Sequence, residues 1–302
     1  MRVVVSGSSG LIGSALCRSL TADGHDVVRL VRRPAGSRAS GDSEIQWDPT
    51  GRALPAGALE GSDAVVHLAG AGIGDHRWTD SYKAEIRDSR VCSTELLATA
   101  IAACTNGPRV MLSGSAVGYY GDTADRELDE SAPAGTDFLA EVCVAWETAT
   151  AAAEVAGTRV AYLRTGIVLA KEGGALRKML PLFKLGVGGK FGSGHQWQSW
   201  ISLPDEVAAI RHLLTADVRG PVNLTAPAPV TGREFARTLG KVLHRPALIP
   251  VPSFAPKLLL GGELVDGLLL SGQRALPRVL QNSGFAFQHE TLEVALRAVL
   301  AR

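Results

Sequence analysis

Ser6-Gly7-Ser8-Ser9-Gly10-Leu11-Ile12-Gly13 is the stretch that decides the fold of this chain. A short apolar run at residues 3–5 precedes it and apolar residues follow it at near-helical spacing, so the glycines lie where a strand turns directly into a helix. Glycine accepts positive φ and carries no Cβ, so such a turn can bring backbone N–H groups and a positive helix N-terminus against a diphosphate. The stretch therefore predicts a nucleotide site made of Gly7, Ser8, Ser9, Gly10, Leu11, Ile12 and Gly13.

The residues after the second predicted strand bear on which dinucleotide binds. A helix stop at 23–25 leads into an apolar strand at 26–31, which completes a βαβ unit of the length that a dinucleotide half-site requires. NAD enzymes carry an acidic residue at the end of this strand, whereas this chain has Val31-Arg32-Arg33. Arginine pairs with phosphate in a fork geometry, so we predict NADP, with Arg32 the first candidate for its 2′-phosphate and Arg33 the second. The alternative is a solvated loop.

Composition excludes several other classes of protein. The 302 residues carry a net charge of +1 with no basic block, which argues against nucleic acid as a partner. The four cysteines lack C-x-x-C spacing, so we expect reduced thiols and neither a disulfide frame nor a metal site. No signal-type segment precedes the first strand, and no run approaches the roughly 20 apolar residues that a membrane span needs. We therefore expect a cytoplasmic protein without membrane contact, whose partner is a small-molecule substrate.

The buried parallel strand predicted at 63–70 ends in small residues. Small side chains at the carboxyl end of a parallel strand leave room for a ligand, because open α/β sheets bind their ligands in the crevice there. His67 lies inside the apolar part of this strand, where we expect a packed, hydrogen-bonded histidine. We assign to the cofactor the residues that end this strand and the next, namely Leu68, Ala69, Gly70 and Ser113.

The segment after the strand at 110–113 carries the candidate catalytic groups, Ser115, Tyr119 and Tyr120. Hydroxyl groups directly after a central strand are placed to act on a substrate carbonyl or hydroxyl. The alternative is a glycine- and tyrosine-rich turn whose buried hydroxyls only find hydrogen-bond partners.

The strict alternation of strands and helices fades after the strand at 159–164. We predict an α/β cofactor domain at 1–165, to which 203–226 returns, and a second lobe at 166–302. This lobe begins in a glycine- and aromatic-rich region, and Thr231-Gly232-Arg233-Glu234 forms a capping box for one of its helices. Candidate substrate-binding residues are Arg77, Arg164, Gln196, Trp197 and Trp200.

Several motifs together resemble the extended short-chain dehydrogenase/reductase superfamily. They are Ser6-Gly7-x-x-Gly10-x-x-Gly13, His67-Leu68-Ala69-Gly70, Ser113-Gly114-Ser115 before Tyr119-Tyr120-Gly121, and Glu130-x-x-Pro133. A closer similarity to an epimerase-like branch, related to nucleoside-diphosphate-sugar epimerases, rests on Arg77-Trp78-Thr79, Gly118-Tyr119-Tyr120-Gly121, Gly192-Ser193-Gly194-x-Gln196-Trp197-x-Ser199-Trp200-Ile201 and Gly284-Phe285-Ala286-Phe287. The resemblance implies a Rossmann-type, doubly wound parallel sheet that binds NADP (NADPH), and a smaller C-terminal α+β substrate lobe. A homodimer is left open, because relatives of this fold often pair through helices.

One departure from the superfamily bears on catalysis. The superfamily uses a Tyr followed four residues later by a Lys, whose ammonium lowers the Tyr pKa so that the phenol can exchange a proton. No Tyr-x-x-x-Lys occurs in this sequence. By spacing after Pro133, the two positions are held by Val142 and Trp146, and neither side chain can replace the original chemistry.

Two hypotheses from different classes follow. In the first, the protein is an NADP-dependent oxidoreductase or epimerase-like enzyme with a relocated acid or base, acting on a small hydroxyl or carbonyl compound or a sugar-nucleotide-like substrate. Ser115 would position the substrate and Tyr119 or Tyr120 would donate the proton, with Glu141 and Cys143 as weaker candidates. In the second, it is a catalytically silent protein that senses NADP or presents an interaction surface. Fold-level analogy favours the enzyme.

Overall fold

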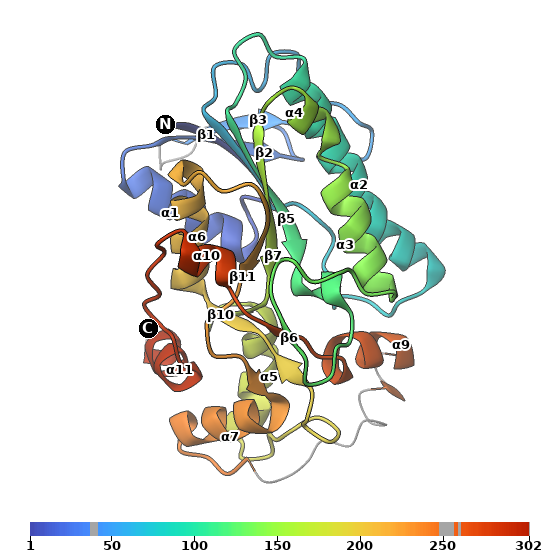
Figure 1. The fold of residues 1–302 in the computed structure, drawn as a ribbon, viewed down its shortest axis with the longest axis vertical. Coiled ribbons are helices and arrows are strands. Elements are labelled where there is room, and N and C mark those ends of the chain that lie inside the picture. Colours follow the sequence, from blue (N-terminus) through green and yellow to red (C-terminus); the bar gives the residue numbers. More distant parts are fainter. Residues whose placement is uncertain (37–41, 248–256, 259–260, 302) are drawn as a thin grey trace.

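The central feature of the computed structural model, which describes residues 1–36, 42–247, 257–258 and 261–301, is a seven-stranded sheet (Figure 1). Every neighbouring pair in it is parallel, in the order β11-β7-β5-β4-β1-β2-β3. The strands are β1 (Arg2–Ser6), β2 (Asp26–Val31), β3 (Ser43–Gln46), β4 (Ala64–His67), β5 (Val110–Ala116), β7 (Arg159–Thr165) and β11 (Gly220–Leu224). The predicted Rossmann-type fold class is confirmed.

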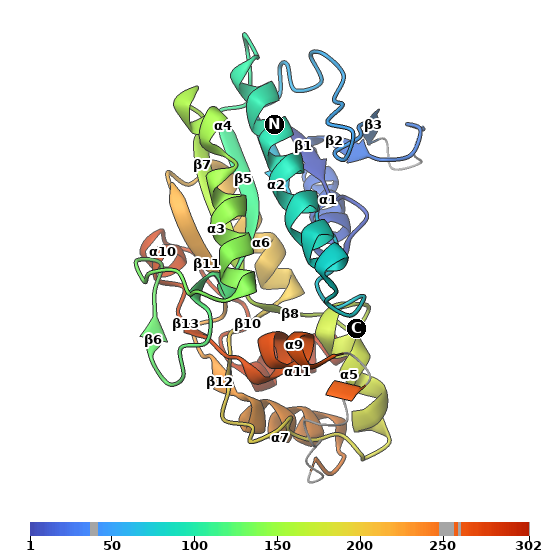
Figure 2. The same ribbon diagram turned by 90° about the vertical axis from the view of Figure 1, so that its right-hand side faces the viewer.

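Helices cover both faces of this sheet, because its strands are apolar on both sides. Val3 and Val5 pack with α1 (Leu11–Ala22) and α6 (Leu203–Thr215), whereas Val4 between them packs with α2 (Asp80–Ala102) and α4 (Ala151–Val155). Figure 2 shows α2, α3 (Phe138–Thr148) and α4 side by side along one face. This three-layer arrangement leaves only the strand ends open to a ligand.

The chain reverses its direction of winding at β1. β1 pairs with β2 on one side, where Val3 lies opposite Val27, and with β4 on the other, where Val3 lies opposite Ala64. The loop between β1 and α1 therefore lies at the switch point of the sheet, where open α/β sheets bind their ligands.

A second group of elements, with its own apolar core, lies below the sheet in Figure 1. Leu180, Trp200, Phe235 and Leu296 are buried together there. The predicted capping box is present, since Thr231 and Glu234 each bond the other's backbone N–H. The remaining elements are η1 (Val117–Tyr120), β6 (Glu127–Leu128), β8 (Ile167–Leu169), α5 (Gly174–Lys184), β9 (Trp197–Gln198), β10 (Trp200–Ser202), β12 (Val230–Thr231), α7 (Gly232–Leu243), α9 (Gly262–Val265), η2 (Asp266–Leu270), β13 (Arg274–Ala275), α10 (Arg278–Asn282) and α11 (Leu292–Ala301).

The helical segment that follows β6 is interrupted after Thr148, and forms the two helices α3 and α4. The hydroxyl of Thr148 donates to Val144 O at 2.8 Å, and that of Thr150 to Glu147 O at 2.8 Å. Such bonds compete with the helical hydrogen bonds of the backbone, which explains the break.

Among the described residues, no helix is long and apolar enough to span a membrane. β11 pairs with β7, and the division of the chain into domains at residue 165 stays a proposal.

Candidate functional site

The glycine turn between β1 and α1 has a geometry that other residues could not adopt. Gly7 has φ of 65°, and a Cβ there would lie 2.6 Å from the carbonyl carbon of Leu68. Gly10 N–H donates to Gly7 O at 2.9 Å, which closes the turn. A Cβ on Gly13 would collide with that same carbonyl oxygen. The backbone of the turn is therefore packed against both the next strand loop and its own helix.

The N-terminus of α1 is open to an acceptor. Gly10 at the N-cap has no side chain to bond the first N–H groups, and the first turn contains no acidic residue. The first N–H groups of a helix have no partner inside it, and the helix dipole is positive at this end. The turn fits a diphosphate, because a Cβ-free backbone and unpaired N–H donors meet at the switch point of the sheet.

Arg32 and Arg33 follow β2 but differ in their contacts. Arg33 makes two bonds to the carboxylate of Glu44, at 2.8 and 2.6 Å. Arg32 is exposed and takes part in no ion pair in the part of the chain that the structure describes. Of the two guanidinium groups, that of Arg33 is therefore held by a carboxylate, whereas that of Arg32 has no such partner among the described residues.

A buried ion pair that the sequence analysis missed lies below the glycine turn. Arg29 in β2 bonds the carboxylate of Asp42 at 2.5 and 2.6 Å, and its Nη1 also donates to Ser8 O at 3.3 Å. Thr21 of α1 donates to the same carboxylate at 2.8 Å. The sequence does contain a signal for this pair, because Arg29 lies within the apolar strand at 26–31 and a buried charge requires a partner.

His67 is packed and hydrogen bonded, as predicted. It is fully buried, with Nδ1 2.6 Å from Ser6 Oγ and Nε2 3.0 Å from Ser93 Oγ. Burial, with a smaller contribution from the positive charge of Arg90, lowers the pKa of His67 to about 3. The imidazole therefore stays neutral and links β1, β4 and α2 at the strand ends.

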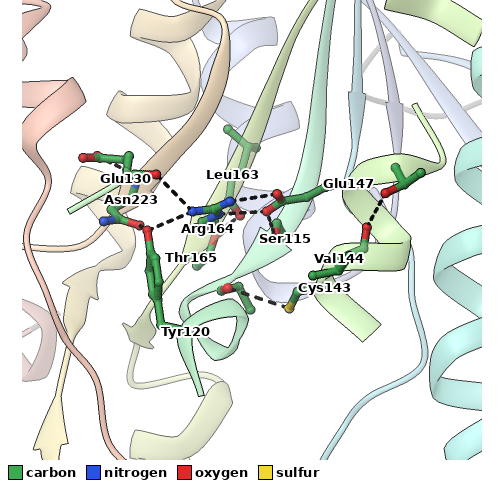
Figure 3. Close-up of polar contacts among 12 residues, drawn as sticks. Ser115, Tyr120, Glu130, Cys143, Val144, Glu147, Leu163, Arg164, Thr165 and Asn223 are labelled. Carbon is green, nitrogen blue, oxygen red and sulfur yellow. Dashed lines mark hydrogen bonds and ion pairs between the residues drawn. The ribbon is translucent and has the colours of Figure 1, made fainter. Parts of the chain in front are cut away.

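A buried polar network joins residues from five elements (Figure 3). Arg164 in β7 holds both carboxylate oxygens of Glu147 in α3, at 2.8 and 2.9 Å. Ser115 Oγ donates to Glu147 Oε1 at 2.7 Å, and Arg164 Nη1 donates to the hydroxyl of Tyr120 at 3.1 Å. Tyr120 in turn donates to Asn223 Oδ1 in β11 at 2.8 Å. The structure thus brings together three residues that the sequence proposed for separate roles, and adds Glu147, which the sequence analysis missed.

The network limits which groups can exchange protons. Burial raises the pKa of Tyr120 to about 12 despite its bond from Arg164, and this side chain is 2% exposed. Burial, with a smaller effect of the charge of Glu147, raises the pKa of Cys143 to about 11. Tyr119 is partly buried, with Arg164 Cζ 3.4 Å from its ring centroid, and its hydroxyl has no hydrogen bond among the described residues. Of the two tyrosines, Tyr119 is the one whose hydroxyl is not bonded to any part of the chain that the structure describes.

Each candidate substrate residue is already held by a hydrogen bond within the protein. Arg77 donates to Leu258 O at 2.6 Å, Gln196 to Leu269 O at 2.8 Å, and Trp197 to Asp125 Oδ1 at 2.8 Å. Trp200 is fully buried in the second core, with its Nε1 bonded to Ala228 O, and we therefore leave it out of the substrate site. A cleft of about 740 Å³ lies at the start of α3, and its lining includes Trp78, Asp122, Phe138, Leu139, Gly267 and Leu270.

Comparison with known proteins agrees with this geometry. A model of the NAD dependent epimerase/dehydratase family matches residues 3–225, and a domain of unknown function (DUF1731) matches 251–299. The chain belongs to the NAD dependent epimerase/dehydratase family. An epimerase family protein of Mycobacterium bovis is 48% identical over 97% of this chain and 96% of its own length. The human epimerase family protein SDR39U1 is 38% identical over 100% of both chains.

The structure is also similar to solved structures of epimerase family proteins. A crystal structure of human SDR39U1 with NADPH has a TM-score of 0.89 and 35% identity, covering 100% of this chain and 99% of the human one. A UDP-glucuronic acid 4-epimerase from Bacillus cereus, at 16% identity, has a TM-score of 0.80 over 100% of this chain and 98% of its own, and shows the fold alone. The expected relationship to epimerase-like dehydrogenases is confirmed.

Proposed function

We propose that this protein binds NADPH along the carboxyl ends of β2, β1, β4 and β5 and uses it in a reductase- or epimerase-type reaction on a small hydroxyl or carbonyl compound. The observation that carries the proposal is the glycine turn, where Gly7 and Gly13 leave no room for a Cβ and α1 presents an uncapped N-terminus. The human relative, whose crystal structure is described with NADPH, supports the choice of cofactor. We assign Leu68, Ala69, Gly70 and Ser113 to the same crevice.

Preference for NADPH over NADH follows from Arg32. The exposed guanidinium carries no ion pair among the described residues, and it follows β2 where the 2′-phosphate would lie. Purified protein titrated with both dinucleotides should bind NADPH more tightly than NADH. Equal dissociation constants for NADPH and NADH would contradict the role of Arg32 at the 2′-phosphate. They would still be consistent with a nicotinamide dinucleotide as the cofactor.

Ser115 and Tyr119 are the residues that we place against the substrate. Bound NADPH would supply the hydride. Ser115 donates its proton to Glu147 and so has lone pairs with which to accept a hydrogen bond from a substrate hydroxyl. Arg164 keeps the Glu147 carboxylate in place, which orients Ser115. Tyr119 would give a proton to a substrate oxygen, whereas the contacts of Tyr120 remove it from this role.

Replacement of one hydroxyl tests these roles. Tyr119→Phe should lower turnover by about a hundredfold, the usual contribution of a positioned acid, and leave the dissociation constant of NADPH unchanged. Tyr162→Phe is the matched control, because the Tyr162 hydroxyl donates to Glu154. Unchanged turnover in Tyr119→Phe would move the proton donor to another residue.

A protein that binds NADPH without turnover is the second candidate function. It is favoured by Val142 and Trp146, which are 3% and 7% exposed and which, by spacing after Pro133, hold the positions of the superfamily's Tyr and Lys. Incubation with NADP or NADPH and a panel of alcohols, carbonyl compounds and sugar nucleotides separates the two functions. We expect a change in nicotinamide absorbance or an epimerised product with at least one compound. A panel with neither result, from protein that binds NADPH, would favour the sensor.

A further inference from the structure

Arg90 is a partly buried cation that the proposed reaction does not yet use. It lies in the middle of α2, and its guanidinium reaches the loop after β4, where a Cβ on Gly70 would be 3.1 Å from Arg90 Cζ. Its Nη1 donates to Ile86 O at 2.9 Å, and no acidic residue lies within ion-pair distance in the described part of the chain. A guanidinium has five N–H donors, so most of those on Arg90 remain available.

Trp146 lies against Arg90 from the opposite helix. Arg90 Cζ is 5.0 Å from the Trp146 ring centroid, which is a cation–π contact between α2 and α3. The ring packs over β5 so closely that a Cβ on Gly114 would lie 2.6 Å from Trp146 Cζ2. The indole that stands in the place of the superfamily's lysine therefore holds a positive charge supplied by a neighbouring helix.

Two more buried donors accompany this pair. Trp146 Nε1 and Ser113 Oγ are both buried, and neither has a hydrogen-bond partner within the described ranges. A buried donor without an acceptor costs free energy, so each of these donors favours a ligand that supplies an oxygen acceptor. His67 does not supply an acceptor for these donors, because its two ring nitrogens are already hydrogen bonded to Ser6 and Ser93.

We propose that Arg90, stacked on Trp146, binds the nicotinamide ribose of NADPH and supplies from α2 the positive charge that relatives with Tyr-x-x-x-Lys supply from α3. The inference rests on the proposed cofactor. The glycine turn would hold the diphosphate at the end of β1, and Arg90 approaches the crevice at the loop after β4, the next strand along. The ribose hydroxyls offer acceptors to Trp146 Nε1 and to the N–H groups of Arg90 that the bond to Ile86 O does not use.

Two ligands separate a contact with this ribose from a general effect on the site. NADPH contains the nicotinamide ribose, whereas adenosine 2′,5′-bisphosphate contains only the adenine half. Arg90→Gln should weaken NADPH binding by about tenfold or more, as expected for loss of a charged hydrogen bond, and leave adenosine 2′,5′-bisphosphate binding unchanged. Arg87→Gln is the matched control, because Arg87 is exposed on the same helix and pairs with Asp88; it should change neither constant.

Arg90→Lys keeps the cation and should recover part of the lost NADPH affinity. Equal NADPH affinity of Arg90→Gln and wild type would overturn the proposal, and so would an equal loss for both ligands, which would show a structural role. Wild-type protein that binds adenosine 2′,5′-bisphosphate but not NADPH would also overturn it. Wild-type protein that binds neither ligand would instead contradict the proposed function on which the inference depends.

Discussion

The glycine turn and the Glu147–Arg164 network lie at the same edge of the sheet but are built in opposite ways. The turn uses residues 7–13, and its critical contacts are backbone atoms, such as Gly10 N–H to Gly7 O. The network uses side chains of β5, η1, α3, β7 and β11, and Tyr120 and Asn223 within it are 103 residues apart. The first site depends on the absence of side chains and the second on their presence.

Because of this difference, we expect substitutions in the two sites to have different effects on binding and on folding. A new Cβ in the turn meets backbone that cannot move aside, so binding should fail before folding does. Removal of one member of the ion pair in the network leaves the other charge buried without a counter-charge. Such a change should therefore destabilise the fold before it affects binding. The network also holds Ser115, which links stability of the fold to the proposed chemistry.

Arg164→Met should have the largest effect, because it leaves the Glu147 carboxylate buried without its cation. We expect the free energy of unfolding to fall by about 3–5 kcal/mol in urea denaturation. The matched control is Arg297→Met, which breaks the exposed Arg297–Glu293 pair and should cost less than about 1 kcal/mol. A loss from Arg164→Met as small as that of the control would mean that water reaches Glu147.

Gly13→Ala should affect binding most among changes in the turn. The added Cβ meets Gly7 O, and the displaced turn should lose two charged hydrogen bonds to a diphosphate, which weakens NADPH binding by about a hundredfold. Gly24→Ala is the control at the other end of α1, where Gly24 has φ of 78° with open space around it. It should cost stability and leave NADPH affinity unchanged. Similar affinities for the two variants would contradict the close packing of the turn.

His67, which lies beside the glycine turn, should make the free energy of unfolding depend on pH. Its folded pKa of about 3 lies below the ordinary value of 6.5, so the unfolded chain binds the proton first as the pH falls. The stability that neutral His67 contributes is therefore complete above pH 6.5 and is lost towards pH 3. Between pH 6.5 and 5 we expect a decrease of about 1.5 kcal/mol in unfolding free energy.

His67→Gln should remove this part of the pH dependence, whereas replacement of the exposed His195 by Gln should retain it. Denaturant unfolding at a series of pH values measures both variants. The same acid sensitivity in His67→Gln as in wild type would assign the effect to other groups.

Arg32→Ala should have the smallest of these effects. Loss of a phosphate contact at an exposed site should weaken NADPH binding by about tenfold and leave NADH binding unchanged. Arg33→Ala is the control, since Arg33 is already paired with Glu44. A larger loss for Arg33→Ala than for Arg32→Ala would reverse their order.

The fold and the glycine turn could be predicted from sequence because their causes are local. Apolar strands buried on both faces, glycines at a strand-to-helix junction and the capping box at Thr231 are each encoded within a few residues. The packed state of His67 also followed from its apolar neighbours.

The network could not be predicted, because no spacing rule links Ser115 with Glu147 or Arg164 with Tyr120. The contact of Arg90 with Trp146 could not be predicted for the same reason, since it forms only when α2 and α3 lie side by side. Tyr120 has the residue type of a catalytic group and the surroundings of a structural one. Only its bonds to Asn223 and Arg164 distinguish the two.

β11 closes one edge of the central sheet with residues that are made long after those of β7. During synthesis at about 5–20 residues per second, the backbone donors and acceptors of β7 that face away from β5 stay unpaired for several seconds before Gly220–Leu224 emerge from the ribosome. An open strand edge is a template for pairing with other chains. Nascent chains that stall between 165 and 220 should therefore be the form of this protein most dependent on chaperones.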